Sequence, residues 1–367
     1  MTKNILIVGL GLIGASLALC IRKQHPGYHL LGFDTNAVSC QIALEQNLVH
    51  QVSSELEDVA VMADVIILCV PIKTSILLLK ELSQMELKEH VLVTDTGSTK
   101  TAIVATAETY LAPKKLDFIG GHPMAGSHKS GIGAANVHLF ENAYFILTPC
   151  SLTKSDTATK LMDILSGTDA RFIQVNPQEH DYITSQVSHF PHVLASSLMH
   201  QAGEYAADYP FTNNFAAGGF RDMTRIAESE PDMWTSILLT NPEAIIERID
   251  DFQTRLTNIV ALLKARKEEE IWQFFDQGRQ IRKVMEIHKR AGVDSFYDLF
   301  INVPDEEDTV LNVLEILRGI SIVNIRINEE NREDIHGILQ ITFKNKENLD
   351  EAANRLKKQT SYQIYLD

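Results

Sequence analysis

Two groups of residues in this 367-residue chain have types and spacings that suggest chemistry. The first is the glycine-rich run GLGLIG, and the second is a set of histidines, serines and arginines that begins at Ser98. Glycine turns of this spacing hold the pyrophosphate of a dinucleotide, and a histidine beside one can accept a proton during hydride transfer. Together the two groups indicate an oxidoreductase.

The glycine-rich run lies where an apolar strand, residues 4–8, is expected to turn into a helix that begins near residue 12. Gly9 would allow the tight turn, Gly11 would let the backbone approach a pyrophosphate, and Gly14 would let the helix pack closely on the strand. The expected cofactor contacts in this turn are Gly9, Leu10, Gly11, Leu12, Ile13 and Gly14.

Asp34 follows the next apolar strand, residues 29–33, about 20 residues beyond the last glycine, which is the spacing of the ribose-binding acid. A carboxylate there would bind both ribose hydroxyls and repel a 2′-phosphate, so the sequence favours NAD over NADP. Val70 and Pro71, at the end of a later strand, are two further expected cofactor contacts.

His122 is the first candidate for the catalytic base. It lies in the run GGHPMAGS, in a loop expected after a strand at residues 118–120, at the edge of the sheet where ligands bind. An imidazole is mostly neutral near pH 7 and can accept a proton there. His180, His189 and His192 share one helical stretch, but no Cys joins them and no HExxH pattern appears, so no metal site is predicted.

The elements expected around these residues predict an α/β fold of three domains. Strands alternate with helices as far as residue 175, which is typical of a Rossmann-type, mostly parallel sheet. The period then becomes helical, with amphipathic stretches at 250–267 and 269–291. The predicted domains are an NAD-binding domain at 1–176, a helical substrate and dimerisation domain at 177–292, and a small α+β domain at 296–367.

The composition argues against several classes of protein. A net charge of −15 argues against nucleic acid or an anionic membrane as a partner. The apolar run near the N-terminus is broken by three glycines and is shorter than the roughly 20 residues of a membrane span, so we expect a cytoplasmic protein. The four cysteines show no metal spacing and are expected to be buried, reduced thiols.

Five motifs, GLGLIG, DTGSTK, GGHPMAGS, SHFPH and GFRDMTRIA, occur in this order. In this respect the chain resembles the prephenate and arogenate dehydrogenase family of tyrosine biosynthesis. The resemblance implies that the chain oxidatively decarboxylates prephenate to 4-hydroxyphenylpyruvate and CO2 with formation of NADH. It places the catalytic histidine at His122, the serine that orients it and touches the nicotinamide at Ser98, and the substrate-binding arginine at Arg225. Further substrate contacts are expected at Ser127, His128, His180, His192 and Arg221.

Four of these assignments have alternatives. His180 and His192 could instead be core or rim histidines whose hydrogen bonds are satisfied within the protein. Arg225 could instead form a surface ion pair with Asp222, three residues away on a helix, and Arg221 could form an ion pair at the solvent surface. The loop after Gly126 carries no acid that would bind the ammonium of arogenate, so prephenate is the favoured substrate. A 3-hydroxyacid dehydrogenase and a non-catalytic NAD-sensing regulator are alternatives of other classes.

The last seventy or so residues resemble an ACT domain, a ferredoxin-like regulatory fold that often binds amino acids. The usual glycine is absent from the turn at residues 304–308, which leaves amino-acid binding there open. Tyrosine is a possible feedback inhibitor of such an enzyme. The long amphipathic helices offer more apolar surface than one subunit can cover, so a homodimer is expected, with the active site between the sheet and the helices.

Overall fold

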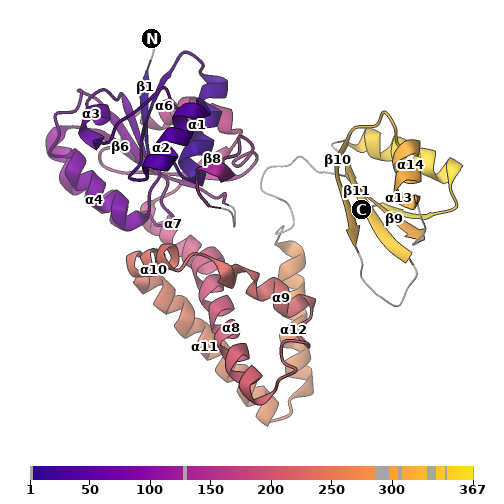
Figure 1. Cartoon of the computed structure of the whole chain (residues 1–367). Helices are drawn as coiled ribbons and strands as arrows, with labels where there is room; N and C mark the ends of the chain where they lie inside the picture. The colour runs from indigo at the N-terminus through magenta and orange to yellow at the C-terminus, as the bar shows by residue number, and fades with distance from the viewer. Residues whose placement is uncertain are drawn as a thin grey trace. The chain divides into compact units, whose positions relative to one another are not determined.

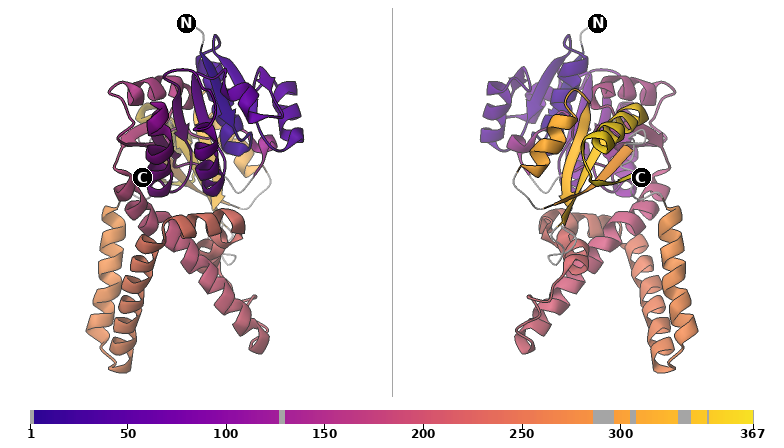
Figure 2. Two further views of the ribbon diagram at one scale, coloured as in Figure 1. Left: turned by 90° about the vertical axis from the view of Figure 1, so that its left-hand side faces the viewer. Right: turned by 90° about the vertical axis from the view of Figure 1, so that its right-hand side faces the viewer.

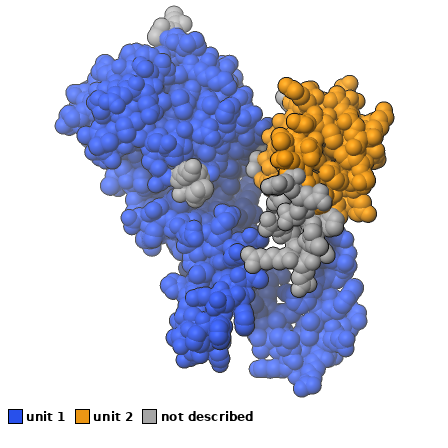
Figure 3. Space-filling view, turned by 45° about the vertical axis from the view of Figure 1, so that its right-hand side comes forward, with its two compact units in different colours: residues 1–285 blue, residues 286–367 orange. Residues whose placement is uncertain are grey.

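The computed structural model describes residues 3–126, 130–285, 297–304, 308–328, 336–343 and 345–366. It divides into two compact units, residues 1–285 and 286–367, which Figure 3 shows in different colours. The predicted boundary at residue 176 lies inside the first unit and stays a prediction. No helix in the described ranges is both long and apolar enough to cross a membrane.

The first unit begins with an eight-stranded sheet in the order β3-β2-β1-β4-β5-β6-β7-β8. Only β6 and β7 pair antiparallel, so the predicted mostly parallel sheet is confirmed. The strands are β1 (Asn4–Val8), β2 (His29–Phe33), β3 (Gln51–Val52), β4 (Val65–Leu68), β5 (Leu92–Asp95), β6 (Asp117–Pro123), β7 (Tyr144–Pro149) and β8 (Arg171–Gln174).

Helices cover both faces of this sheet (Figure 1). In β1, Ile5 and Ile7 join the core under one set of helices, and Leu6 and Val8 join the core under the other. A strand buried on both faces needs a continuous apolar run, which explains the four apolar residues that follow Asn4. One face carries α1 (Leu12–Gln24), α2 (Ala37–Glu45) and α6 (Thr157–Ile164); the other carries α3 (Leu56–Ala60), α4 (Ile72–Leu82) and α5 (Thr101–Leu111).

A helical segment completes the first unit. Its helices are α7 (Pro177–Thr184), α8 (Phe190–Asp208), α9 (Gly218–Thr224), α10 (Pro231–Thr240), α11 (Pro242–Lys264) and α12 (Glu268–Val284). One π-helical turn, Ser185–His189, joins α7 to α8, and turns of this kind are frequent at functional sites. Figure 2 shows α8 diverging from the pair that α11 and α12 form.

The second unit is a four-stranded antiparallel sheet in the order β10-β11-β9-β12, with the element order strand, helix, strand, strand, helix, strand. This is the arrangement expected of a ferredoxin-like, ACT-type domain. Its apolar core lies between the sheet and its helices. The elements are β9 (Tyr297–Pro304), α13 (Thr309–Ile316), β10 (Ile322–Asn328), β11 (His336–Phe343), α14 (Lys346–Gln359) and β12 (Gln363–Leu366).

Several boundaries differ from the prediction, among them the end of the strand before Val70, which ends at Leu68, and the three that follow. The strand at 118–120 continues to Pro123, so the prediction that His122 lies in a loop is wrong: its backbone pairs with Ile146 of β7. The predicted helix at 250–267 begins earlier, at Pro242, because proline is well tolerated in the first turn of a helix. The predicted helix at 269–291 ends at Val284 where the structure describes it.

Candidate active site

The glycine turn has the geometry that a dinucleotide site requires. Gly9 has a φ of +94°, and a Cβ on it would lie 2.4 Å from the carbonyl oxygen of Cys69. A Cβ on Gly14 would lie 1.9 Å from the oxygen of Gly9, whereas a Cβ on Gly11 would meet no atom within 4 Å. The packing of the chain therefore requires glycine at positions 9 and 14. At Gly11 the open space is where a pyrophosphate would approach the backbone and the N-terminus of α1.

Asp34 lies beside this turn, as the sequence predicted. Its Oδ2 accepts a hydrogen bond from the Leu10 N–H at 2.7 Å, and its Oδ1 accepts one from the Asn36 N–H at 2.8 Å. These bonds fix the carboxylate at the end of β2. Val70 also lies against the turn, because its Cγ1 would be 2.7 Å from a Cβ on Gly9. Asp34 and Val70 therefore lie together with the glycine turn.

His122 lies at the end of β6, where a buried hydrogen-bond chain holds it. Its Nδ1 is 2.8 Å from the Nε2 of His180, whose Nδ1 is 2.8 Å from the Oδ1 of Asp181. Burial lowers the pKa of His122 well below its usual value, and the neighbouring His180, Lys100 and His189 lower it further. The imidazole of His122 is therefore neutral at pH 7 and can accept a proton.

Sequence reasoning missed a buried ion pair beside His122. The Lys100 ammonium and the Asp95 carboxylate are both 0% exposed and bonded to each other. Lys100 also donates to the carbonyl oxygen of Gly121 at 2.6 Å, and Asp95 accepts from the Gly97 N–H at 2.7 Å. The pair links the loop after β5, which carries the half-buried Ser98, to the backbone next to His122.

His180 is 1% exposed, and both of its ring nitrogens are bonded to protein groups. The sequence predicted that His180 contacts the substrate. In the structure its two ring nitrogens are instead bonded to His122 and Asp181, so neither is free for the substrate. His192 is more accessible. Its Nδ1 donates to the Ser188 carbonyl oxygen at 2.8 Å, and its ring stacks on Trp234 with the centroids 3.6 Å apart. Trp234 is a further residue that sequence reasoning did not find.

Arg225 begins the short helical turn Arg225–Glu228 after α9 and is exposed. It forms no ion pair with Asp222 or with any other residue that the structure describes, so the surface pair considered above is not formed. Burial lowers the pKa of His192, the bond to the Ser188 carbonyl oxygen opposes this shift, and the positive charge of Arg225 lowers the pKa further. The Arg225 guanidinium is exposed, so it is accessible to an anion.

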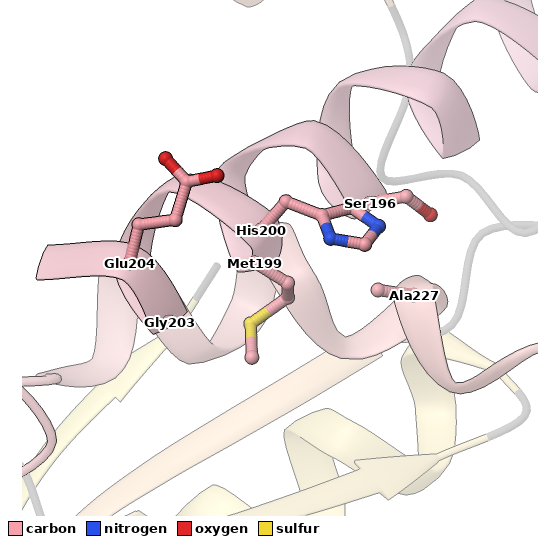
Figure 4. Close-up of a pocket in the computed structure, with 6 residues that line it drawn as sticks. All are labelled: Ser196, Met199, His200, Gly203, Glu204 and Ala227. Atoms are coloured by element: carbon pink, nitrogen blue, oxygen red, sulfur yellow. The ribbon is translucent and has the colours of Figure 1, made fainter. Parts of the chain in front are cut away.

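The remaining predicted residues are less informative. Arg221 is exposed on α9, and Ser127 and His128 lie outside the described residues. A pocket of about 470 Å³ lies further along α8, lined by Ser196, Met199, His200, Gly203, Glu204 and Ala227 (Figure 4). Neither His122 nor Ser98 lines it, so it is not the site itself. In the described ranges, no group of three or more His, Cys, Asp and Glu side chains could hold a metal ion.

A stability prediction arises from His189, which is 1% exposed. Burial lowers its pKa from 6.5 to about 4, so the unfolded chain binds the proton more readily than the folded one. Stability from this group is complete above pH 6.5 and is lost as the pH falls towards 4. At pH 5 we expect a loss of about 2 kcal/mol in the free energy of unfolding. Urea unfolding at pH 7 and pH 5 measures it, and an equal loss in His189→Gln would assign the effect elsewhere.

Comparison with known proteins is consistent with this arrangement. Residues 17–174 match the family model "Prephenate dehydrogenase, nucleotide-binding domain", and residues 176–277 match "Prephenate dehydrogenase, dimerization domain". The chain is 50% identical to a prephenate dehydrogenase of Lactococcus lactis subsp. cremoris over 99% of both chains. It is 39% identical to a prephenate dehydrogenase of Bacillus subtilis over 100% of this chain and 98% of the relative.

Among solved structures, prephenate dehydrogenase from Aquifex aeolicus in complex with hydroxyphenyl propionate and NAD+ is similar, with a TM-score of 0.71 and 30% identity. The similarity covers 77% of this chain and 98% of that one.

Proposed function

The chain belongs to the prephenate dehydrogenase family, and we propose that it catalyses the NAD-dependent oxidative decarboxylation of prephenate to 4-hydroxyphenylpyruvate and CO2. The observation that carries the proposal is the 50% identity to a prephenate dehydrogenase over 99% of both chains. It is supported by a neutral histidine, His122, at the edge of the sheet that carries the glycine turn. NAD, when bound, supplies the hydride acceptor, and the open space at Gly11 and the carboxylate of Asp34 fit it.

In the proposed mechanism the Nε2 of His122 accepts a hydrogen bond from the hydroxyl of prephenate. As the carbinol carbon loses hydride with its electron pair, the C–O bond gains carbonyl character and the hydroxyl proton becomes acidic. His122 takes up this proton. The bond between the ring and its carboxylate then breaks, its electron pair makes the ring aromatic, and the proton returns from His122 to the phenol oxygen.

The remaining roles are proposals on the same basis. Ser98, in the loop after β5, would orient His122 and touch the nicotinamide, and His192 and Arg225 would face the substrate. Arg221, Ser127 and His128 keep their predicted roles as further substrate contacts. Arg225 offers a planar pair of donors that matches a carboxylate. We propose the same division into domains as the sequence predicts, at 1–176, 177–292 and 296–367.

We expect Arg225→Ala to raise the KM for prephenate about 10- to 100-fold with a small effect on kcat, because a charge-assisted bond to a carboxylate contributes about 1.5–3 kcal/mol. Arg225→Lys should recover only part of the loss, since an ammonium lacks the bidentate geometry. Initial rates against prephenate concentration measure both. The control is Arg255→Ala, whose guanidinium pairs with Asp251 on the surface of α11. An unchanged KM in Arg225→Ala would remove Arg225 from the substrate site.

We also propose a homodimer formed through the helical segment. Large apolar side chains of α11 and α12 are exposed in the single chain, among them Leu256, Leu263, Trp272 and Phe275. This agrees with the match of residues 176–277 to the family's dimerization domain. Light scattering after size exclusion should give twice the mass of one chain, and a monomer at working concentrations would contradict the proposal.

The experiment that tests the function is an initial-rate assay of the purified full chain at the NADH absorbance band. Prephenate and arogenate are supplied separately, each with NAD and with NADP, and each repeated with tyrosine. We expect turnover with prephenate and NAD. Turnover of arogenate alone would keep the family and change the substrate, and no turnover with either would contradict the enzymatic proposal. Inhibition by tyrosine and a cytoplasmic location stay predictions.

A further inference from the structure

Behind the proposed base lies a hydrogen-bond chain that the reaction scheme does not yet use. The Nδ1 of His122 is 2.8 Å from the Nε2 of His180, and the Nδ1 of His180 is 2.8 Å from the Oδ1 of Asp181. His180 is 1% exposed and Asp181 is 3% exposed, so water does not compete for these bonds. The three side chains come from two elements, β6 and α7, that are about sixty residues apart in sequence.

Asp181 is held as a carboxylate at the N-terminus of α5. Its Oδ1 accepts from the Lys100 N–H at 2.7 Å, and its Oδ2 accepts from the Thr101 N–H at 2.8 Å. Burial raises its pKa, but the bonds from His180, Thr101 and Lys100 outweigh burial, so the net pKa is lowered. The positive end of the helix dipole favours the same charge state. An ionised carboxylate can only accept hydrogen bonds.

The Asp181 carboxylate determines which ring nitrogens of His180 and His122 carry hydrogen. Because Asp181 only accepts, the Nδ1 of His180 carries hydrogen, and an imidazole with its single hydrogen on Nδ1 can only accept at Nε2. The Nδ1 of His122 must then be the donor in the bond between the rings, which leaves the lone pair on Nε2. In the described residues no group hydrogen-bonds to that Nε2.

We propose that Asp181 and His180 are positioning residues that hold His122 in the tautomer with hydrogen on Nδ1, so that its Nε2 faces the substrate hydroxyl as the base. The kinetic effect of this role rests on the proposed function, whereas the tautomer of His122 does not. The hydrogen-bond chain also distributes the positive charge that forms on His122 during the reaction. When Nε2 takes the hydroxyl proton, the Nδ1 proton of His122 can shift to the Nε2 of His180, beside the Asp181 carboxylate. Both protons return when the phenol forms, so no net proton is gained or lost.

The first test is spectroscopic and does not depend on turnover. The protein is labelled with ¹⁵N-histidine, the His122 signals are assigned with His122→Asn, and long-range ¹H–¹⁵N correlation reports which ring nitrogen carries hydrogen. We expect Nδ1–H in the wild-type protein and a mixed or inverted tautomer in Asp181→Asn. Asparagine is nearly isosteric and keeps one of the two acceptor oxygens that bond to the Lys100 and Thr101 N–H groups at the start of α5. An Nε2–H tautomer in the wild type, or no change in Asp181→Asn, would overturn the proposal.

The second test is kinetic. Asp181→Asn should lower kcat for prephenate about 10²- to 10³-fold, by weakening a positioned base, while KM changes less than about threefold. The control is Asn176→Ala, which removes the capping bond from the Gln178 N–H to the Asn176 Oδ1 at 2.9 Å at the start of α7 but keeps the bonds from the Lys100 and Thr101 N–H groups to Asp181. A loss of kcat in Asn176→Ala as large as in Asp181→Asn would make the role structural.

A second pair of variants covers the case in which Asp181→Asn does not fold. His180→Leu removes the acceptor for the Nδ1–H of His122 and should lose both the tautomer and kcat. His180→Gln supplies an amide oxygen to accept that hydrogen and an amide N–H to donate to Asp181, so it should retain the tautomer. Equal tautomers in the two variants would contradict the proposal. If the wild type shows Nδ1–H but does not turn over prephenate, the positioning role stands and the proposed function fails.

Discussion

Replacing His122 by asparagine is expected to lower kcat for prephenate by about two to four orders of magnitude with little effect on KM, the size of effect known for a positioned base. The His122 imidazole is neutral at pH 7, so a neutral amide does not change the charge of the free site. The amide also lies near the position of Nδ1 and can still donate to His180. What the variant lacks is a group where Nε2 would meet the substrate hydroxyl.

Steady-state rates with prephenate and NAD measure this effect, and circular dichroism checks that the variant is folded. His138→Asn is the control, because His138 is exposed and its imidazole bonds to Glu141 at the surface. It should keep wild-type kcat and KM. If His122→Asn kept near-full turnover, another group would be the base, and the hydrogen-bond chain through His180 would lose its proposed purpose.

Much of the fold could be predicted because its signals are local. The apolar runs of β1 and β2 predicted their bounds, since a strand buried on both faces is apolar after its first position, where these strands carry Asn4 and His29. β3 was missed because a strand of two residues has no period to detect. β6 was predicted to end at Gly120 but continues through Gly121 to Pro123, although glycine weakens a strand interior. Here the glycine is required by the sheet itself: a Cβ on Gly121 would lie 2.6 Å from the carbonyl oxygen of Asp95.

The residues of the site could be predicted only where a short motif and its spacing define how the residues are arranged. The glycine turn and Asp34 form such a unit, and the structure places them together. Asp181 was not named, although it follows His180 directly, because its partners at the start of α5 are about eighty residues away. Lys100 was read as part of DTGSTK without a role. A lysine in a motif is normally exposed, and nothing local indicates that it is fully buried against a carboxylate.

The largest effect on stability is expected at this lysine. Lys100→Met should lower the free energy of unfolding by about 3–5 kcal/mol, because it leaves the 0%-exposed Asp95 carboxylate without its cation. Burial lowers the pKa of Lys100, yet the neighbouring Asp95 charge opposes this shift, so each group depends on the other. The matched control is Lys88→Met. Its ammonium bonds to Asp64 at 2.8 Å with both side chains about two-fifths exposed, and such surface pairs contribute about 0–1 kcal/mol.

Urea unfolding of the single variants and of Lys100→Met with Asp95→Asn separates the pair from its surroundings. If the loss in Lys100→Met comes from an unpaired charge, neutralising Asp95 should restore part of it, and the double variant should be less destabilised than the sum of the singles. Additive losses, or a loss in Lys100→Met no larger than in Lys88→Met, would contradict this explanation. Recovery cannot be complete, because the Gly121 carbonyl still loses its bond to Lys100. That carbonyl adjoins His122, so kcat should stay below the wild-type value even where stability returns.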